Sequence, residues 1–298
     1  MKKSALLLLT LGLAACTDQA STAADTATPD AADTAPAEPA ASTDTATEPA
    51  ATSPAAASGE VIPTKTGTNT LAVMGRLEVL TLDPGAAYDY GSVLFVKNIY
   101  EPLVAYQGSS MTDLQGLLAT DWAEEEGGTQ YRFNLRPDVT FHSGNAFSCA
   151  DAEYTFRRDL ITNTADSGNW FLAESLLGSK VNASEDPSIT WERISNAVAC
   201  EGETLVFKLP KVDPSFVPKL AFFGYGIVDS RHAKELGEWD GTEATWKDWI
   251  GKDISGSALS ADPSGTGVYQ LASQDTSNVT VQAFEDYWNG SPAIKNVV

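Results

Sequence analysis

Positively charged residues are scarce in this chain. Of its 298 residues, 19 are Lys or Arg and 40 are Asp or Glu, which gives a formal net charge of −21 at pH 7. Such a surface repels a polyanion and releases no counterions from it, so we expect no nucleic acid and no anionic lipid as partners. The same charge is compatible with a cationic or zwitterionic ligand.

Sequence signatures of hydrolases and of zinc sites are also missing. The chain contains no Ser-x-x-Lys, Gly-x-Ser-x-Gly or His-Glu-x-x-His, and its two histidines are His142 and His232. Neither histidine stands in ligand spacing with a cysteine, so we expect no metal site. A secreted hydrolase is therefore disfavoured, and we expect no catalytic residues and no cofactor.

The apolar run at residues 5–13 is too short to span a bilayer stably. It follows the basic start of residues 1–3 and ends in Leu-Ala-Ala-Cys16, which is typical of a secretory signal peptide. The ending resembles the bacterial lipobox, so we expect residues 1–15 to be removed and Cys16 to carry the lipid. The alternative is an ordinary signal peptide with an incidental cysteine. Two acyl chains would anchor the protein outside the cytoplasm, in the cell envelope, on the periplasmic side or at the cell surface.

Aromatic residues are absent from residues 17–68. This segment consists almost entirely of Ala, Thr, Pro, Ser, Asp and Glu, and its acidic side chains are opposed only by Lys65. Such a composition cannot form a core, and like charges along a Pro-rich chain favour extension. We interpret residues 16–68 as the lipidated cysteine and a disordered stalk, whose random coil would reach on the order of 40 Å.

Only two cysteines remain beside Cys16, namely Cys149 and Cys200. In an oxidising envelope such a pair favours a disulfide, which would close a loop of about fifty residues and stabilise the fold by about 4 kcal/mol on the chain-entropy model. The alternative is two separate buried thiols, because the sequence does not give the distance between their Cα atoms.

The region from residue 69 onward carries the Trp, Tyr and Phe residues and is long enough for one large or two small domains. Apolar spacing predicts a helix over 92–100 that ends before Pro102. Ser148 followed by Asp151 predicts the capped start of a second helix. Alternating or short apolar runs predict strands, with a polar turn at 274–278 between the last two. Those strands are 70–74, 131–135, 205–209, 222–228, 268–271 and 279–284, which together with the helices indicate an α/β fold.

Read in order, seven short motifs resemble the family 5 extracellular solute-binding proteins, which include the oligopeptide, dipeptide and nickel receptors of ABC importers. Together they cover nearly the whole region from residue 69 onward. The matching segments are 82–84, 99–104 (Ile-Tyr-Glu-Pro-Leu-Val), 118–122, 131–144, 147–151, 265–269 and 286–290.

The resemblance implies a periplasmic-binding-protein-like fold (type II, cluster C), with two lobes that close on a ligand by hinge motion. It implies a first lobe formed by 69–102 plus 215–298 and an inserted small domain at 103–214. The expected ligand is a peptide or related small solute, delivered by a monomeric receptor to the membrane subunits of an ABC permease.

One departure from the family concerns length. The sequence stops at residues 294–298, where the family continues from a strand into the other lobe. We therefore expect the second lobe to be absent, because the chain is truncated or because that lobe is encoded separately. The alternative function is a binding or chaperone-like lipoprotein that derives from a receptor and has no transport role.

The resemblance also implies ligand contacts. The segment after the first strand faces the cleft in the family. Aromatic residues in or next to nearby loops could stack on a ligand or merely pack against their neighbours. The resemblance also places His142 in an ordinary structural turn. The expected ligand-binding residues are Gly75, Arg76, Leu77, Glu78, Tyr88, Tyr90 and Trp170.

Overall fold

The computed structural model describes residues 69–73 and 78–298, all of which belong to one compact unit at 61–298. The signal peptide, Cys16 and the stalk lie outside the described residues. So do three of the expected ligand-binding residues, Gly75, Arg76 and Leu77.

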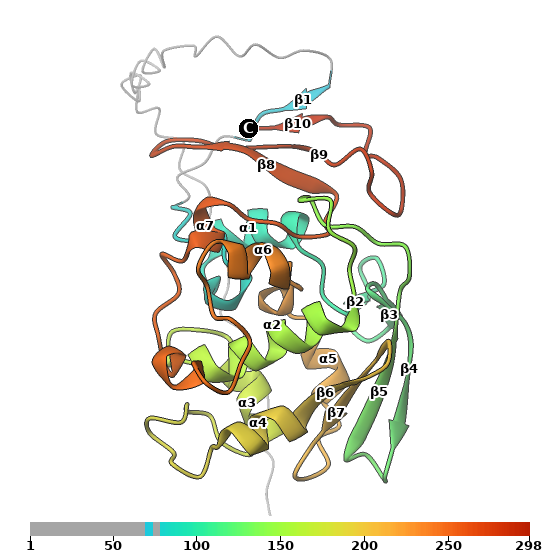
Figure 1. Ribbon diagram of the computed structural model, residues 1–298. Helices are drawn as coiled ribbons and strands as arrows, with labels where there is room; N and C mark the ends of the chain where they lie inside the picture. The colour runs from blue at the N-terminus through green and yellow to red at the C-terminus, as the bar shows by residue number, and fades with distance from the viewer. Residues whose placement is uncertain (1–68, 74–77) are drawn as a thin grey trace, which may run out of the picture. The chain divides into compact units, whose positions relative to one another are not determined.

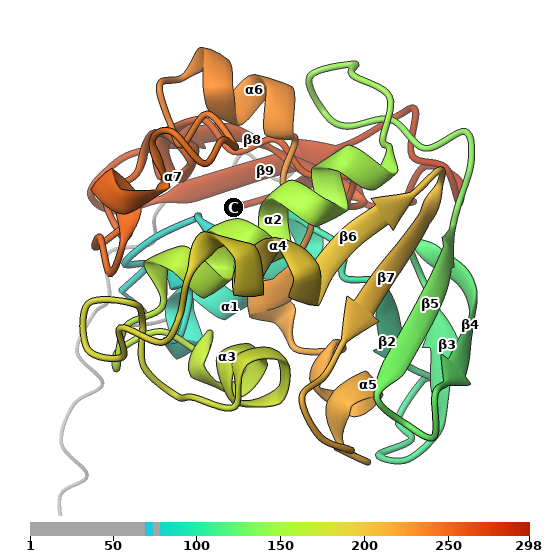
Figure 2. The same ribbon diagram turned by 60° about the horizontal axis from the view of Figure 1, so that its bottom comes forward.

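One sheet has four antiparallel strands in the order β4 (Ala119–Glu125), β5 (Gln130–Leu135), β7 (Thr204–Lys208) and β6 (Val198–Glu201). The predicted alternation along β5 is confirmed, because Tyr131 and Phe133 are buried while their neighbours are partly or fully exposed. The helix α2 (Cys149–Thr162) lies against β6 and β7 (Figure 2). This sheet therefore buries one face against α2.

A second sheet has the strand order β1 (Thr70–Leu71), β10 (Asn296–Val297), β9 (Val279–Ala283) and β8 (Tyr269–Gln274). β1 runs parallel to β10, and the other neighbours are antiparallel. The predicted hairpin of the last two strands is confirmed as β8 and β9. The second sheet lies beside α1 (Tyr90–Ile99), which contacts β8 (Figure 1).

The remaining elements are short. β2 (Val104–Tyr106) and β3 (Leu114–Gly116) form a small antiparallel hairpin. No helix among the described residues has both the length and the apolar character that a membrane span requires. The other helices are α3 (Trp170–Leu177), α4 (Trp191–Ala197), α5 (Phe216–Lys219), α6 (Ser230–Glu235) and α7 (Ala258–Ala261), with 3-10 turns η1 (Pro84–Ala86), η2 (Phe223–Tyr225) and η3 (Trp246–Trp249).

The start of α2 follows the predicted pattern. Asp151 Oδ2 accepts hydrogen bonds from the backbone nitrogen and the hydroxyl of Ser148, at 2.9 and 2.8 Å. These bonds belong to a capping box that satisfies the first turn of the helix. The other oxygen of Asp151 accepts from the backbone nitrogen of Ser230, so the cap also fixes the start of α6.

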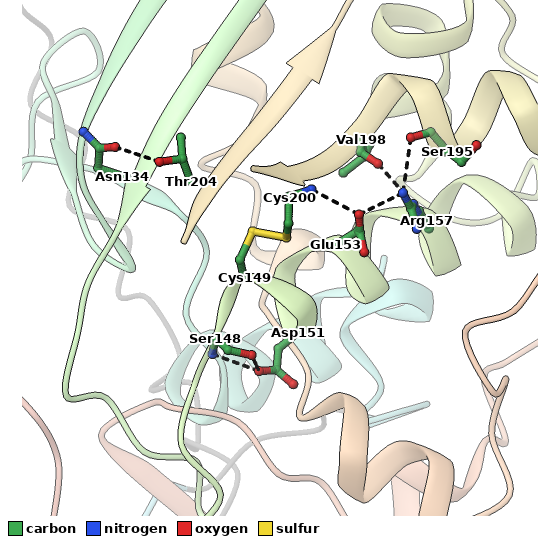
Figure 3. The surroundings of a disulfide bond; sticks show 10 residues. All are labelled: Asn134, Ser148, Cys149, Asp151, Glu153, Arg157, Ser195, Val198, Cys200 and Thr204. Atoms are coloured by element: carbon green, nitrogen blue, oxygen red, sulfur yellow. Dashed lines mark hydrogen bonds and ion pairs between the residues drawn. A yellow bond between two sulfur atoms is a disulfide. The ribbon is translucent and has the colours of Figure 1, made fainter. Parts of the chain in front are cut away.

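A disulfide joins Cys149 at the start of α2 to Cys200 in β6 (Figure 3). Their Cα atoms lie 5.9 Å apart, so of the two arrangements left open by the sequence the structure has the bonded one. Glu153, one turn further along α2, accepts a hydrogen bond from the Cys200 backbone nitrogen at 3.1 Å and pairs with Arg157 at 2.8 Å. The attachment of α2 to the edge strand β6 therefore combines a covalent bond with a hydrogen bond to a carboxylate.

The segment 222–228, predicted as a strand, is not one. It contains the 3-10 turn η2, flanked by extended residues. A Cβ atom at Gly226 would collide with the Tyr100 side chain, and one at Gly224 would collide with the Phe222 ring. The chain thus bends closely around neighbouring aromatic rings, and these tertiary contacts override the β preference of the aromatic run.

Candidate functional site

Aromatic side chains from three separate segments meet on one partly exposed surface. The Tyr88 ring lies edge-on to Phe171 and to Phe222, with centroids 6.4 and 6.1 Å apart. The ring centroids of Trp170 and Phe171 lie 3.8 Å apart, and those of Phe222 and Phe223 lie 4.2 Å apart. Tyr88 is 47% exposed and the other four rings are partly buried. We call these five residues the aromatic surface.

Close backbone approach lets these rings meet. A Cβ atom at Gly168 would collide with the Phe222 ring, so only glycine fits there. Beneath the rings, the Tyr225 hydroxyl donates to the carbonyl of Gly168 and accepts from the backbone nitrogen of Leu172, both at 3.0 Å. This buried tyrosine holds the loop before α3 and the start of α3 against η2.

The segment of Glu78 lies against the first turn of α1. The backbone nitrogens of Leu80 and Thr81 donate to the Ser92 hydroxyl at 3.1 and 3.0 Å, and Asp89 caps the helix by accepting from the Ser92 nitrogen. At this helix start Tyr90 is 71% exposed. The turn of Glu78 and the exposed Tyr90 are therefore held at one end of α1.

A hollow of about 900 Å³ lies between α1 and the second sheet. Glu78 and Lys97 contribute charged groups to it, and Leu94 and Phe95 contribute apolar surface from α1. The sheet side supplies further apolar residues. These are Leu71, Val73, Val279, Val281, Val297 and Val298.

A second hollow, of about 720 Å³, contains both histidines and is lined mainly by Ser, Gln and Asp residues. His142 Nε2 donates to the carbonyl of Gly267 at 2.8 Å, with Nδ1 facing the Gly265 nitrogen, and its ring packs edge-on against Phe284. Burial lowers the pKa of His142 to about 4. A neutral imidazole with both nitrogens engaged supports the structural interpretation of His142. Among residues 69–73 and 78–298, no three His, Cys, Asp or Glu side chains are grouped to hold a metal ion.

A buried charge network lies where η1 meets α2. Arg158 donates from Nη1 and Nη2 to the two oxygens of Asp83 at 3.0 and 2.6 Å, and from Nη2 to Glu238 at 3.0 Å. The Ser257 hydroxyl also donates to Asp83 at 2.6 Å. Burial raises the pKa of the neighbouring Asp159 well above its ordinary value, and the charge of Asp83 adds to this while Arg158 opposes it. The network fixes the chain that leads into Tyr88.

The structure thus brings two of the expected ligand-binding residues, Tyr88 and Trp170, onto one surface through Phe171. It places Glu78 on the hollow beside α1 and Tyr90 in solvent at the helix start. Phe222 and Phe223 were not among the predicted ligand-binding residues, because their segment was predicted to be a strand. Gly224 and Gly226 were the available signal, since alternate glycines in an aromatic run indicate close backbone approach.

Comparison with known proteins bears on this site. The family described as "Bacterial extracellular solute-binding proteins, family 5 Middle" matches residues 113–298. The probable ABC transporter periplasmic-binding protein SapA of Escherichia coli (strain K12) is 27% identical over 192 residues, covering 61% of this chain and 30% of SapA. The dipeptide-binding protein of the same organism is 25% identical over 221 residues, covering 72% of this chain and 36% of that protein. The chain thus spans about a third of the length of these curated relatives.

Solved structures share the fold at low sequence identity. OppA of Burkholderia pseudomallei superposes with a TM-score of 0.59 at 18% identity, over 77% of this chain and 41% of OppA. DppA of Helicobacter pylori, solved in complex with the peptide STSA, gives 0.56 at 21% identity, over 76% of this chain and 41% of DppA. The fold is therefore the α/β fold of the two-lobed periplasmic binding proteins, of which this chain covers a part. Since the family match extends over more than half of the sequence, the chain belongs to the bacterial extracellular solute-binding proteins of family 5.

Proposed function

We propose that the chain binds a peptide or a related small solute and that the aromatic surface is one wall of the binding cleft. The convergence of Tyr88, Trp170 and Phe222 from three segments carries this proposal, because rigid and partly exposed rings offer large contact area at low entropic cost. A peptide ligand is supported by the dipeptide-binding relative and by the DppA complex with STSA.

Isothermal titration calorimetry with short peptides tests this proposal. We expect Tyr88→Ala to weaken binding about tenfold, because truncation of a central aromatic contact removes a substantial part of the interface. Tyr106→Ala is the matched control, since Tyr106 is 38% exposed but lies in β2, outside the aromatic surface. Equal affinities of the Tyr88→Ala variant and the unaltered chain would contradict the assignment.

In the same proposal, residues 69–102 with 215–298 form the first lobe and 103–214 form an inserted small domain. The protein acts as a monomeric, extracytoplasmic lipoprotein that passes its ligand to the permease of an ABC importer, and it has no catalytic role. Anchoring at Cys16 would raise the effective concentration of the receptor near the permease. Mass spectrometry of protein purified from membranes tests the anchor. The N-terminal peptide should begin at an acylated Cys16, and a Cys16→Ala variant should be recovered unacylated.

A further inference from the structure

One edge of the aromatic surface already holds a cation. Trp170 and Glu174 lie one turn apart on α3 and therefore face the same way. Lys180 Nζ lies 4.9 Å from the centroid of the Trp170 ring and 3.5 Å from Glu174 Oε1. An aromatic face beside a carboxylate attracts an ammonium group, because the ring quadrupole and the negative charge act in the same direction.

Lys180 is well placed to leave this position. Its side chain is 59% exposed and that of Glu174 is 36% exposed, and exposed ion pairs of this kind contribute little to stability. The Lys180 backbone is fixed independently, since its carbonyl accepts a hydrogen bond from Asn163 Nδ2 at 3.0 Å. The ammonium group can therefore be exchanged for another without disturbing the loop that carries it.

The surroundings favour a positive guest. Residues 163–179 contain two acidic residues, Asp166 and Glu174, and no Lys, Arg or His. From other segments, Lys219 reaches Ser175 at 2.8 Å but is paired with Asp213, and Arg193 donates to the carbonyl of Leu177 at the far end of α3. Trp170 continues into the aromatic surface through its contact with Phe171. The first turn of α3 carries partial positive charge, which disfavours a cation, so the carboxylate of Glu174 is needed to hold one there. The strongly negative charge of the whole chain also attracts cationic ligands over longer distances.

We propose that Trp170 and Glu174 form an ammonium-binding subsite of the aromatic surface, which Lys180 occupies in the unliganded protein and which a lysine side chain of a basic peptide takes over on binding. This inference rests on the proposed peptide-binding function. It adds a preference for basic peptides and a role for Lys180 as an internal competitor.

The test compares two tripeptides that differ only in the terminal ammonium group, Ala-Lys-Ala and Ala-norleucine-Ala. Calorimetry on the full chain should give about fivefold tighter binding of Ala-Lys-Ala, in line with a partly exposed cation–aromatic contact. Lys180→Met removes the competitor and should tighten Ala-Lys-Ala binding by a further factor of about three. Glu174→Gln, an isosteric change of a partly exposed residue, should abolish the preference, so that the two peptides bind this variant with equal affinity.

NMR tests directly whether Lys180 occupies the subsite in the unliganded protein. In 1H–13C NMR spectra, the side-chain methylenes of Lys180 should show an upfield ring-current shift that Trp170→Leu removes. Addition of Ala-Lys-Ala should return these signals to random-coil positions, whereas Ala-norleucine-Ala should move them less. If both peptides bind equally and Glu174→Gln changes neither affinity, the subsite is refuted and the proposed function stands. If neither peptide binds to any variant, the proposed peptide-binding function fails together with the subsite.

Discussion

The sheet of β4–β7 and the sheet of β1 and β8–β10 are attached to their neighbouring segments by different chemistry. The first is joined to α2 by the disulfide between Cys149 and Cys200 and by the hydrogen bond from Cys200 to Glu153. α2 is in turn held to η1 by the ion pair of Arg158 and Asp83. The disulfide is covalent and the pair of Arg158 and Asp83 is fully buried, while the hydrogen bond to Glu153 is partly buried.

The second sheet is attached through neutral and titratable groups. Glu101, at the end of α1, accepts hydrogen bonds from the Thr266 hydroxyl, the Tyr287 hydroxyl and Trp288 Nε1, at 2.8, 2.6 and 2.9 Å. His142 holds the same approach to β8 through the carbonyl of Gly267. Burial raises the pKa of Glu101 while these three donors oppose the shift, and burial lowers the pKa of His142. Because a lowered pKa in the folded state favours the neutral form, acid should weaken the second attachment through His142, whereas the raised pKa of Glu101 acts in the opposite direction.

The largest effect is expected for the buried ion pair of Arg158 and Asp83. Asp83→Ala leaves the guanidinium of Arg158 buried with Glu238 as its one remaining ion-pair partner, so it should lower the free energy of unfolding by about 3–5 kcal/mol, measured by urea denaturation. Glu201→Gln is the control, because the pair of Arg132 and Glu201 is exposed and should contribute less than about 1 kcal/mol. Similar losses for both variants would show that burial does not distinguish the two pairs.

The disulfide should come next. Its cysteines are 51 residues apart, and on the chain-entropy model removal of such a crosslink costs about 4 kcal/mol. Because Glu153 also ties α2 to β6, we expect the double variant Cys149→Ala, Cys200→Ala to remain folded with a loss of about 2–4 kcal/mol in urea denaturation. The loss should be the same at pH 7 and pH 5. A larger loss at pH 5 than at pH 7 would show that the attachment of the first sheet also depends on pH, as that of the second sheet does.

The elements that the sequence predicted correctly are those set by local pattern. The helix over 92–100, the capping box at Ser148 and the hairpin of β8 and β9 each depend on residues within one short segment. The strand predicted at 222–228 failed because its conformation is set by contacts with Tyr100, far away in sequence. Local preference cannot contain that information.

The same distinction holds for the site. Tyr88 and Trp170 were predicted from their own segments, but their common surface depends on contacts between distant parts of the chain. Tyr88 contacts Phe171 and Phe222, each more than 80 residues away, and Phe171 contacts Phe222, more than 50 residues away. The disulfide was predicted as one of two arrangements, because only the fold sets the separation of its Cα atoms. Residues 75–77 lie outside the described residues and stay predictions.

The pH dependence of the second attachment should be measurable through His142. The pKa of His142 is about 4 in the folded protein, against an ordinary value of 6.5, so folding favours the neutral form. The contribution of His142 is therefore complete above pH 6.5 and is lost as the pH falls toward 4. By linkage this amounts to about 2–3 kcal/mol between pH 7 and 4.5, measured by urea denaturation at both values. His142→Gln should remove this part of the pH dependence, whereas His232→Gln should retain it.

The smallest effect is expected at Glu101. In Glu101→Gln the amide keeps the size of the side chain and one acceptor oxygen, which can still receive Trp288 and Thr266. The amide nitrogen then faces the Tyr287 hydroxyl, which can rotate to accept from it, so three charge-assisted hydrogen bonds are exchanged for three neutral ones. We expect a loss of about 1–2 kcal/mol in urea denaturation at pH 7. Glu101→Ala leaves three donors without their acceptor, so it should lower the free energy of unfolding further. Equal losses for the two variants would mean that these hydrogen bonds, which attach the second sheet, contribute nothing to stability beyond the volume of the side chain.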